Sequence, residues 1–136
     1  MSLSVTIKTI PHKDQRYPTT GDWGWLADAD NPGAEPTLFV TVSDMGSWRY
    51  EVLVAIHEVI EAYICKWQGI QEFEVNEFDI QFEKRRPRGN VDEPGDESTA
   101  PYYFAHQIAT GVERTLAAIL GVDWHQYEAA NNALYE

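Results

Sequence analysis

The strongest periodic signal in the chain lies in residues 37–68, which read TLFVTVSDMGSWRYEVLVAIHEVIEAYICKWQ. Residues 37–43 are rich in β-branched and aromatic side chains, which predicts a strand. Ser43, Asp44 and Ser47 then offer N-cap oxygens. Apolar residues recur every three or four positions, and Gly69 follows the last of them. This pattern predicts a helix over residues 48–68. The predicted core-facing stripe of that helix comprises Trp48, Val52, Ala55, Ile56, Val59, Ile60, Tyr63, Ile64 and Trp67.

The flanking segments complete an α+β pattern. Alternation of apolar and polar residues predicts a strand over residues 3–10, and the glycine- and aromatic-rich residues 12–36 indicate a packed loop or a short hairpin. Helices are expected over residues 72–86, 101–120 and 123–134. The stripe of the 101–120 helix comprises Phe104, Ile108, Val112, Leu116 and Ile119. Strands followed by helices predict a single domain over residues 1–136, with short N-terminal antiparallel strands and three or four helices.

Composition and charge exclude several classes of function. The chain has 136 residues, of which 43% are hydrophobic, so it can bury a core and is not expected to be disordered. It carries 22 acidic and 10 basic residues, a formal net charge of −12. Such a charge repels phosphate backbones and anionic membranes, so neither nucleic acid nor membrane is an expected partner. It permits metal binding or a basic protein partner.

The expected location is the cytoplasm. Cys65 is the only cysteine, so no intrachain disulfide forms and a reducing compartment is the simpler expectation. The first ten residues do not have the pattern of a signal peptide. No run approaches the roughly 18 apolar residues of a membrane-spanning helix. Cys65 itself is expected to be a small packed residue.

The candidate chemistry lies in the helix predicted over residues 48–68. His57 and Glu61 are four residues apart, so a helix places both side chains on one face, one turn apart. Imidazole and carboxylate are ordinary zinc ligands, and this spacing allows both to bind one ion. Glu58 is offset by roughly 100° around the helix, where it reaches a water on the metal without occupying a ligand position. The spacing therefore predicts a metal site with an adjacent base.

His57, Glu58 and Glu61 form the motif His-Glu-x-x-Glu, which resembles the active-site helix of zincin-type metallopeptidases. This chain departs from that family's His-Glu-x-x-His pattern by having glutamate at position 61. The resemblance implies that His57 and Glu61 are metal ligands and that Glu58 is the general base. It also implies a peptide or a small amide as the substrate.

Further ligands are expected from the helix predicted over residues 101–120. A catalytic zinc ion needs a third protein ligand. His106 and Glu113 are seven residues apart and lie on nearly the same helical face. If the two helices pack side by side, His106 is the natural third ligand. Glu113 either completes the set of metal ligands or holds a ligand histidine in place.

A wider order of motifs is similar to small proteins encoded in phage genomes. It covers about residues 48–127 and carries no implied activity. After His-Glu-x-x-Glu it comprises Phe78-Asp79-x-x-Phe82-Glu83, Glu93-Pro94-Gly95-Asp96, Pro101-Tyr102, His106 and Gly121-Val122-Asp123-Trp124.

Several functions remain open from the sequence. The first is a zinc hydrolase of zincin-like type. The second is a non-catalytic acidic interaction protein with a structural or vestigial metal site and a basic partner, for which the resemblance implies a phage origin. A third is a nucleotide hydrolase in which Glu58, Glu61, Glu83 and Glu113 hold Mg²⁺. The acidic loop at residues 92–97 is expected to be solvated.

Overall fold

A computed structural model describes residues 3–135 and confirms the α+β class. Residues 1–2 and 136, the ends of the predicted domain, lie outside the described residues. The three strands are β1 (Val5–Ile10), β2 (Gly21–Leu26) and β3 (Thr37–Ser43). The helices are α1 (Trp48–Gln68), α2 (Glu72–Arg85), α3 (Tyr103–Ile119) and α4 (Trp124–Ala133), and two 3₁₀ turns are η1 (His12–Asp14) and η2 (Pro94–Asp96). The long helix therefore has the bounds that the sequence predicts.

The sheet is mixed, with β3 in the centre between β1 and β2. The two strands predicted from the sequence, β1 and β3, pair in parallel and not antiparallel as expected. The antiparallel partner of β3 is β2. The reason is the order of the strands: the chain reverses direction twice between β1 and β3, so both run the same way and become neighbours. β2 lies in the segment predicted as a loop or hairpin, because Gly21 and Gly24 weaken its strand signal.

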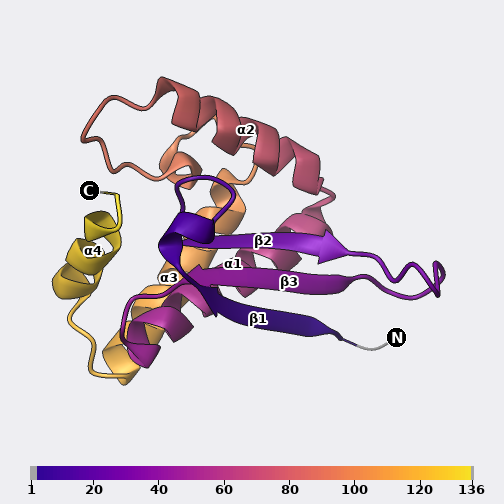
Figure 1. Ribbon diagram of the computed structural model, residues 1–136, viewed down its shortest axis with the longest axis horizontal. Helices are drawn as coiled ribbons and strands as arrows, with labels where there is room; N and C mark the ends of the chain where they lie inside the picture. The colour runs from indigo at the N-terminus through magenta and orange to yellow at the C-terminus, as the bar shows by residue number, and fades with distance from the viewer. Residues whose placement is uncertain (1–2, 136) are drawn as a thin grey trace.

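α1 lies at the centre of the molecule, between the sheet and α3 (Figure 1). The hydroxyl of Ser47 accepts from the backbone N–H of Tyr50 at its start, and Gly69 ends it with φ +75°. Leu38, Val40 and Val42 alternate along β3 and are buried in the core with α1. Because α1 is covered on two sides, it has buried residues that face the sheet and others that face α3.

The predicted buried face is partly confirmed for α1, where Ala55 is buried and Val59, Tyr63 and Ile64 pack against the core. It is wrong at the ends of α1 and for α3. Trp48 and Trp67 are 63% and 81% exposed, although both were assigned to the core-facing stripe. On α3 four of the five predicted stripe residues are exposed: Phe104, Ile108, Val112 and Ile119. The residues of α3 that are buried are Ala105, His106, Ala109, Glu113 and Ala117. Small side chains let the two helices approach closely, and polar residues occupy the space between them.

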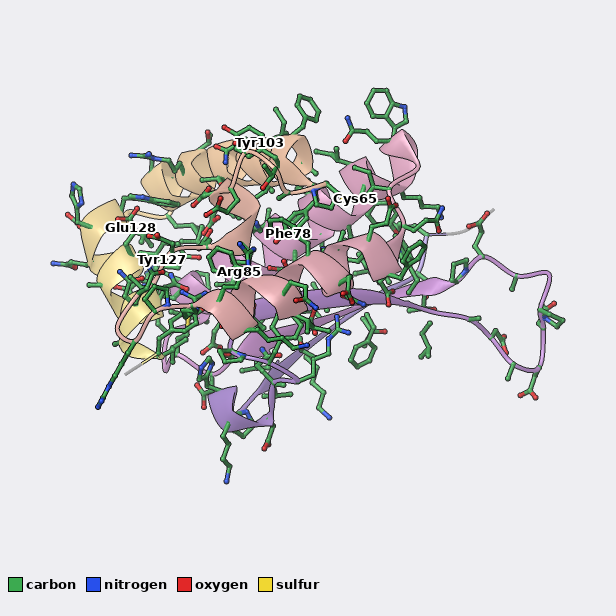
Figure 2. All side chains as sticks on the ribbon, turned by 90° about the horizontal axis from the view of Figure 1, so that it is seen from above. Cys65, Phe78, Arg85, Tyr103, Tyr127 and Glu128 are labelled. Carbon is green, nitrogen blue, oxygen red and sulfur yellow. The ribbon has the colours of Figure 1, made fainter. Side chains whose placement is uncertain are left out.

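The remaining elements surround one end of the α1–α3 pair. Figure 2 shows Tyr127 and Glu128 on α4, at the end of the molecule opposite the long β2–β3 loop. The Asp123 side chain caps α4 by accepting from the backbone N–H of Gln126. The loop from residue 86 to residue 102 contains η2, which packs against α3 and α2.

Within residues 3–135, no helix combines the length and apolar character needed to cross a membrane.

Candidate metal centre

His57, Glu61 and His106 converge between α1 and α3. The Nε2 atom of His57 lies 3.0 Å from Glu61 Oε2 and 3.2 Å from His106 Nδ1. Glu61 Oε2 also accepts from His106 Nδ1 at 2.9 Å. All three residues are at most 8% exposed. The contact between the two helices that the sequence analysis required is present, and it brings His106 to the pair on α1.

The three facing atoms fit one small metal ion. Tetrahedral ligands with bonds of about 2.0–2.1 Å stand roughly 3.3 Å apart. The observed separations of 2.9–3.2 Å are close to that value, so only small side-chain shifts are needed. Two imidazoles and one carboxylate are also a known ligand set of catalytic zinc sites. The chain thus has a buried three-donor cluster within metal-binding distance.

Glu113 holds His57 from the side away from the cluster. His57 Nδ1 donates to Glu113 Oε1 at 2.8 Å, and the hydroxyl of Tyr127 donates to Glu113 Oε2 at 2.5 Å. Of the two roles predicted for Glu113, the geometry matches the second, because its carboxylate orients a histidine and does not face the shared centre. A carboxylate behind a ligand histidine fixes the ring and makes its other nitrogen a better ligand.

Trp23 plays the same part for Glu61. Its indole Nε1 donates to Glu61 Oε1 at 3.0 Å, which leaves Oε2 facing the two histidines. Trp23 is 4% exposed and lies on β2, the strand that the sequence analysis did not identify. Sequence reasoning noted Trp23 only as part of an aromatic loop. Its pairing with Glu61 depends on how β2 crosses α1, for which there is no local signal.

The charges of the cluster compensate one another. Burial alone would raise the pKa of the Glu61 carboxyl, but hydrogen bonds from His106 and His57 outweigh it and lower that pKa to about 2. Burial lowers the pKa of His106, yet contacts with Asp96, Glu61 and Glu93 raise it to about 12. The pKa of His57 is also raised, because hydrogen bonds to Glu113 and Glu61 overcome burial. Metal ligation requires imidazole nitrogens without protons, so protons and a metal ion compete for this cluster.

Glu58, the predicted base, is half-buried and lines the same pocket as the three donors. Burial raises the pKa of its carboxyl well above the ordinary value, and the Glu61 carboxylate adds to the rise. Gly21 of β2 passes directly over it: a β-carbon at position 21 would lie 2.8 Å from Glu58 Oε1 and 2.6 Å from Val54 Cγ1. Glycine at this position is what allows the strand to lie against the site.

The acidic loop reaches the site, contrary to the expectation that it is merely solvated. His106 Nε2 lies 3.0 Å from Glu93 Oε2 and 3.2 Å from Asp96 Oδ1, but neither contact has hydrogen-bond geometry. Gly95 packs on the imidazole of His106 so closely that a β-carbon would overlap the ring. The sequence has Gly95 between Glu93 and Asp96, but this pattern does not indicate which residue the loop contacts.

A pocket of about 380 Å³ opens onto the cluster. β2, α1, α2, the acidic loop, α3 and α4 all contribute to its wall. Glu83, which the nucleotide-hydrolase hypothesis assigned to Mg²⁺, is paired with Arg86 at 2.7 Å and is not among the lining residues. The four carboxylates of that hypothesis therefore do not surround one point. Cys65 is fully buried, as predicted, and burial raises the pKa of its thiol to about 12.

Comparison with known proteins adds no relative: no family model matches the chain, and neither the curated proteins nor the solved structures give a significant match. The resemblances to zincins and to phage-encoded proteins therefore stay predictions.

Proposed function

We propose that this chain is a zinc-dependent hydrolase that cleaves a peptide or amide bond. The observation that carries the proposal is the convergence of His57 Nε2, Glu61 Oε2 and His106 Nδ1 within 3.2 Å at the edge of a pocket that Glu58 also lines. Zinc is favoured over Mg²⁺ or Ca²⁺ because two of the three donors are imidazoles, whereas those ions prefer oxygen.

The open side of the cluster favours catalysis over a purely structural site. Structural zinc sites are closed by four protein ligands, whereas catalytic sites have three and keep one position free. Here three protein donors meet beside a pocket of about 380 Å³. When bound, a zinc ion polarises a substrate carbonyl and acidifies a water molecule.

Each residue then has a distinct task. Glu58 accepts a proton from the attacking water and returns it to the leaving nitrogen. Glu113 and Tyr127 hold the ring of His57 in one orientation, and Trp23 holds Glu61. Gly21 keeps the space beside the Glu58 carboxyl open.

The first test is the metal content of protein purified without a metal-affinity tag. We expect about one zinc ion per chain, because the three donors form a single site. His106→Ala should lose it, whereas His125→Ala, at an exposed histidine on α4, should retain it. If neither the purified protein nor protein dialysed after zinc addition holds zinc, the proposal is wrong.

The second test separates catalysis from metal binding. Glu58→Gln should keep the zinc ion and lower the rate of peptide or amide hydrolysis by about 10²–10⁴-fold, the usual contribution of a general base. Glu97→Gln, an exposed residue of the acidic loop, is the matched control.

The remaining candidate is an acidic interaction protein with a structural or vestigial metal site, which the net charge of −12 favours. It predicts that Glu58→Gln has no effect on any activity, while His57→Ala lowers the Tm. It also predicts salt-sensitive binding of a basic protein.

A further inference from the structure

The pocket beside the metal centre is strongly acidic. Nine of the residues that line it are aspartate or glutamate, and none of its lining residues is lysine or arginine. Four of these acids have hydrogen-bond or ion-pair partners. Glu61 and Glu113 hold the histidines, and Asp79 accepts from the hydroxyls of Tyr17 and Tyr102. Asp22 is paired with Arg16 at 2.6 Å. A fifth acid, Glu58, is half-buried.

The other four acids form the rim, which we define as Asp92, Glu93, Asp96 and Glu128. All four are exposed. The first three come from the acidic loop, whereas Glu128 lies on α4 (Figure 2). Glu128 accepts from the indole Nε1 of Trp124 at 2.6 Å, a neutral donor that leaves its charge uncompensated. A divalent ion in the centre adds only two positive charges, so the rim stays negative.

Two further observations point to a ligand. His106 Nε2 faces Glu93 and Asp96, its side chain is 6% exposed, and it has no hydrogen-bond partner. When His106 binds a metal through Nδ1, Nε2 carries a proton and faces this acidic rim. Arg114 of α3 stacks over Trp124 of α4, with the guanidinium carbon 5.0 Å from the ring centroid. The indole beside Glu128 thus forms a cation–π contact with a guanidinium group of this chain.

We propose that the pocket binds a peptide with an arginine or lysine side chain, and that Glu128 at the rim recognises its positive charge. The substrate class rests on the proposed hydrolase function; the binding preference does not. The same negative field repels acidic peptides and phosphates.

Glu128 is the rim residue best suited to a test. Glu93 and Asp96 contact His106, so changing them disturbs the metal centre as well. Glu128→Gln removes the charge while its amide oxygen still accepts from Trp124. Glu97→Gln removes an equal charge from the acidic loop at a residue outside the pocket wall and serves as the matched control.

The experiment compares two fluorescent peptides that differ only in arginine against citrulline, which have nearly the same shape but a different charge. Binding is measured to zinc-loaded protein and to zinc-loaded Glu58→Gln, at low and high salt. We expect the arginine peptide to bind about tenfold more tightly, as expected for a cation that meets carboxylates and an aromatic ring. Glu128→Gln should reduce the preference to about threefold and Glu97→Gln should leave it unchanged. High salt should weaken it.

Equal binding of the two peptides, or an undiminished preference in Glu128→Gln, overturns this inference. Its failure is distinguishable from that of the proposed function. A preference for arginine without any cleavage contradicts the hydrolase, whereas cleavage of both peptides at equal rates contradicts the cationic substrate.

Discussion

The inner and outer faces of α3 have opposite compositions and opposite environments. The inner face comprises alanines together with His106 and Glu113, and it is buried against α1. The outer face has Phe104, Ile108 and Val112, which are 52%, 43% and 39% exposed. The more apolar face is thus the more exposed one.

This difference shows what the space between α1 and α3 is used for. Ala105, Ala109 and Ala117 are 0–2% exposed and bring the two backbones close together. Close helices allow short side chains from each to meet, which is how His106 reaches His57 and Glu61. Larger inner residues would bury more apolar area but would separate the three donor atoms.

The largest expected effect is that of the metal itself on stability. Zinc at about 1,000 times its dissociation constant should raise the free energy of unfolding by about 4 kcal/mol, because it binds only the folded state. Thermal unfolding with and without zinc measures this. His106→Ala on the inner face should abolish the increase, and His125→Ala should not. An equal increase in His106→Ala would show that zinc binds elsewhere.

The next largest effect should come from forcing α1 and α3 apart. Ala109→Leu inserts three carbon atoms into a fully buried position that faces α1, and overpacking of this kind costs about 1–3 kcal/mol. Urea denaturation measures the loss, and the same variant should bind zinc more weakly. If Ala109→Leu has unchanged stability and zinc affinity, then the close approach of the helices is not what assembles the site.

Loss of the Glu113 carboxylate behind His57 should have a somewhat smaller effect. Glu113→Gln replaces the carboxylate that accepts from His57 Nδ1, and such changes lower metal affinity about 10–100-fold. Competition with a fluorescent zinc chelator measures the affinity, with Glu97→Gln as the control. An unchanged affinity would show that the carboxylate behind His57 does not tune the metal centre.

The smallest effect is expected on the outer face. Ile108→Ser removes an apolar side chain that is 43% exposed, so the free energy of unfolding should change by no more than about 0.5 kcal/mol. Urea denaturation of Ile108→Ser beside Ala109→Leu compares adjacent residues on opposite faces. A loss above about 1.5 kcal/mol, typical of a buried position, would indicate that the outer face is covered in solution.

Much of the local structure was predictable, while the helix faces were not. The bounds of α1 follow from its cap, its apolar spacing and the glycine after it. The assignment of Phe104, Ile108 and Val112 to the core was wrong, because apolar spacing identifies a stripe and not what covers it. β2 was missed because Trp23 and Trp25 stand among glycines, and its pairing with β3 is a non-local contact.

The candidate site, too, was predictable only in part. His57, Glu58 and Glu61 were identified from their spacing, since a helix places residues four apart on one face whatever surrounds it. The remaining contacts join different elements, so no local pattern predicts them. They are the approach of His106, the support from Glu113, Tyr127 and Trp23, and the contacts of Glu93 and Asp96.

The sequence by itself therefore determined the elements and one half of the candidate centre, because backbone hydrogen bonding and side-chain period act over a few residues. Only the tertiary structure decided which face of each helix is buried and which residues complete the centre. Those outcomes depend on packing between different elements, where the small size of the α3 alanines and of Gly21 and Gly95 allows close approach.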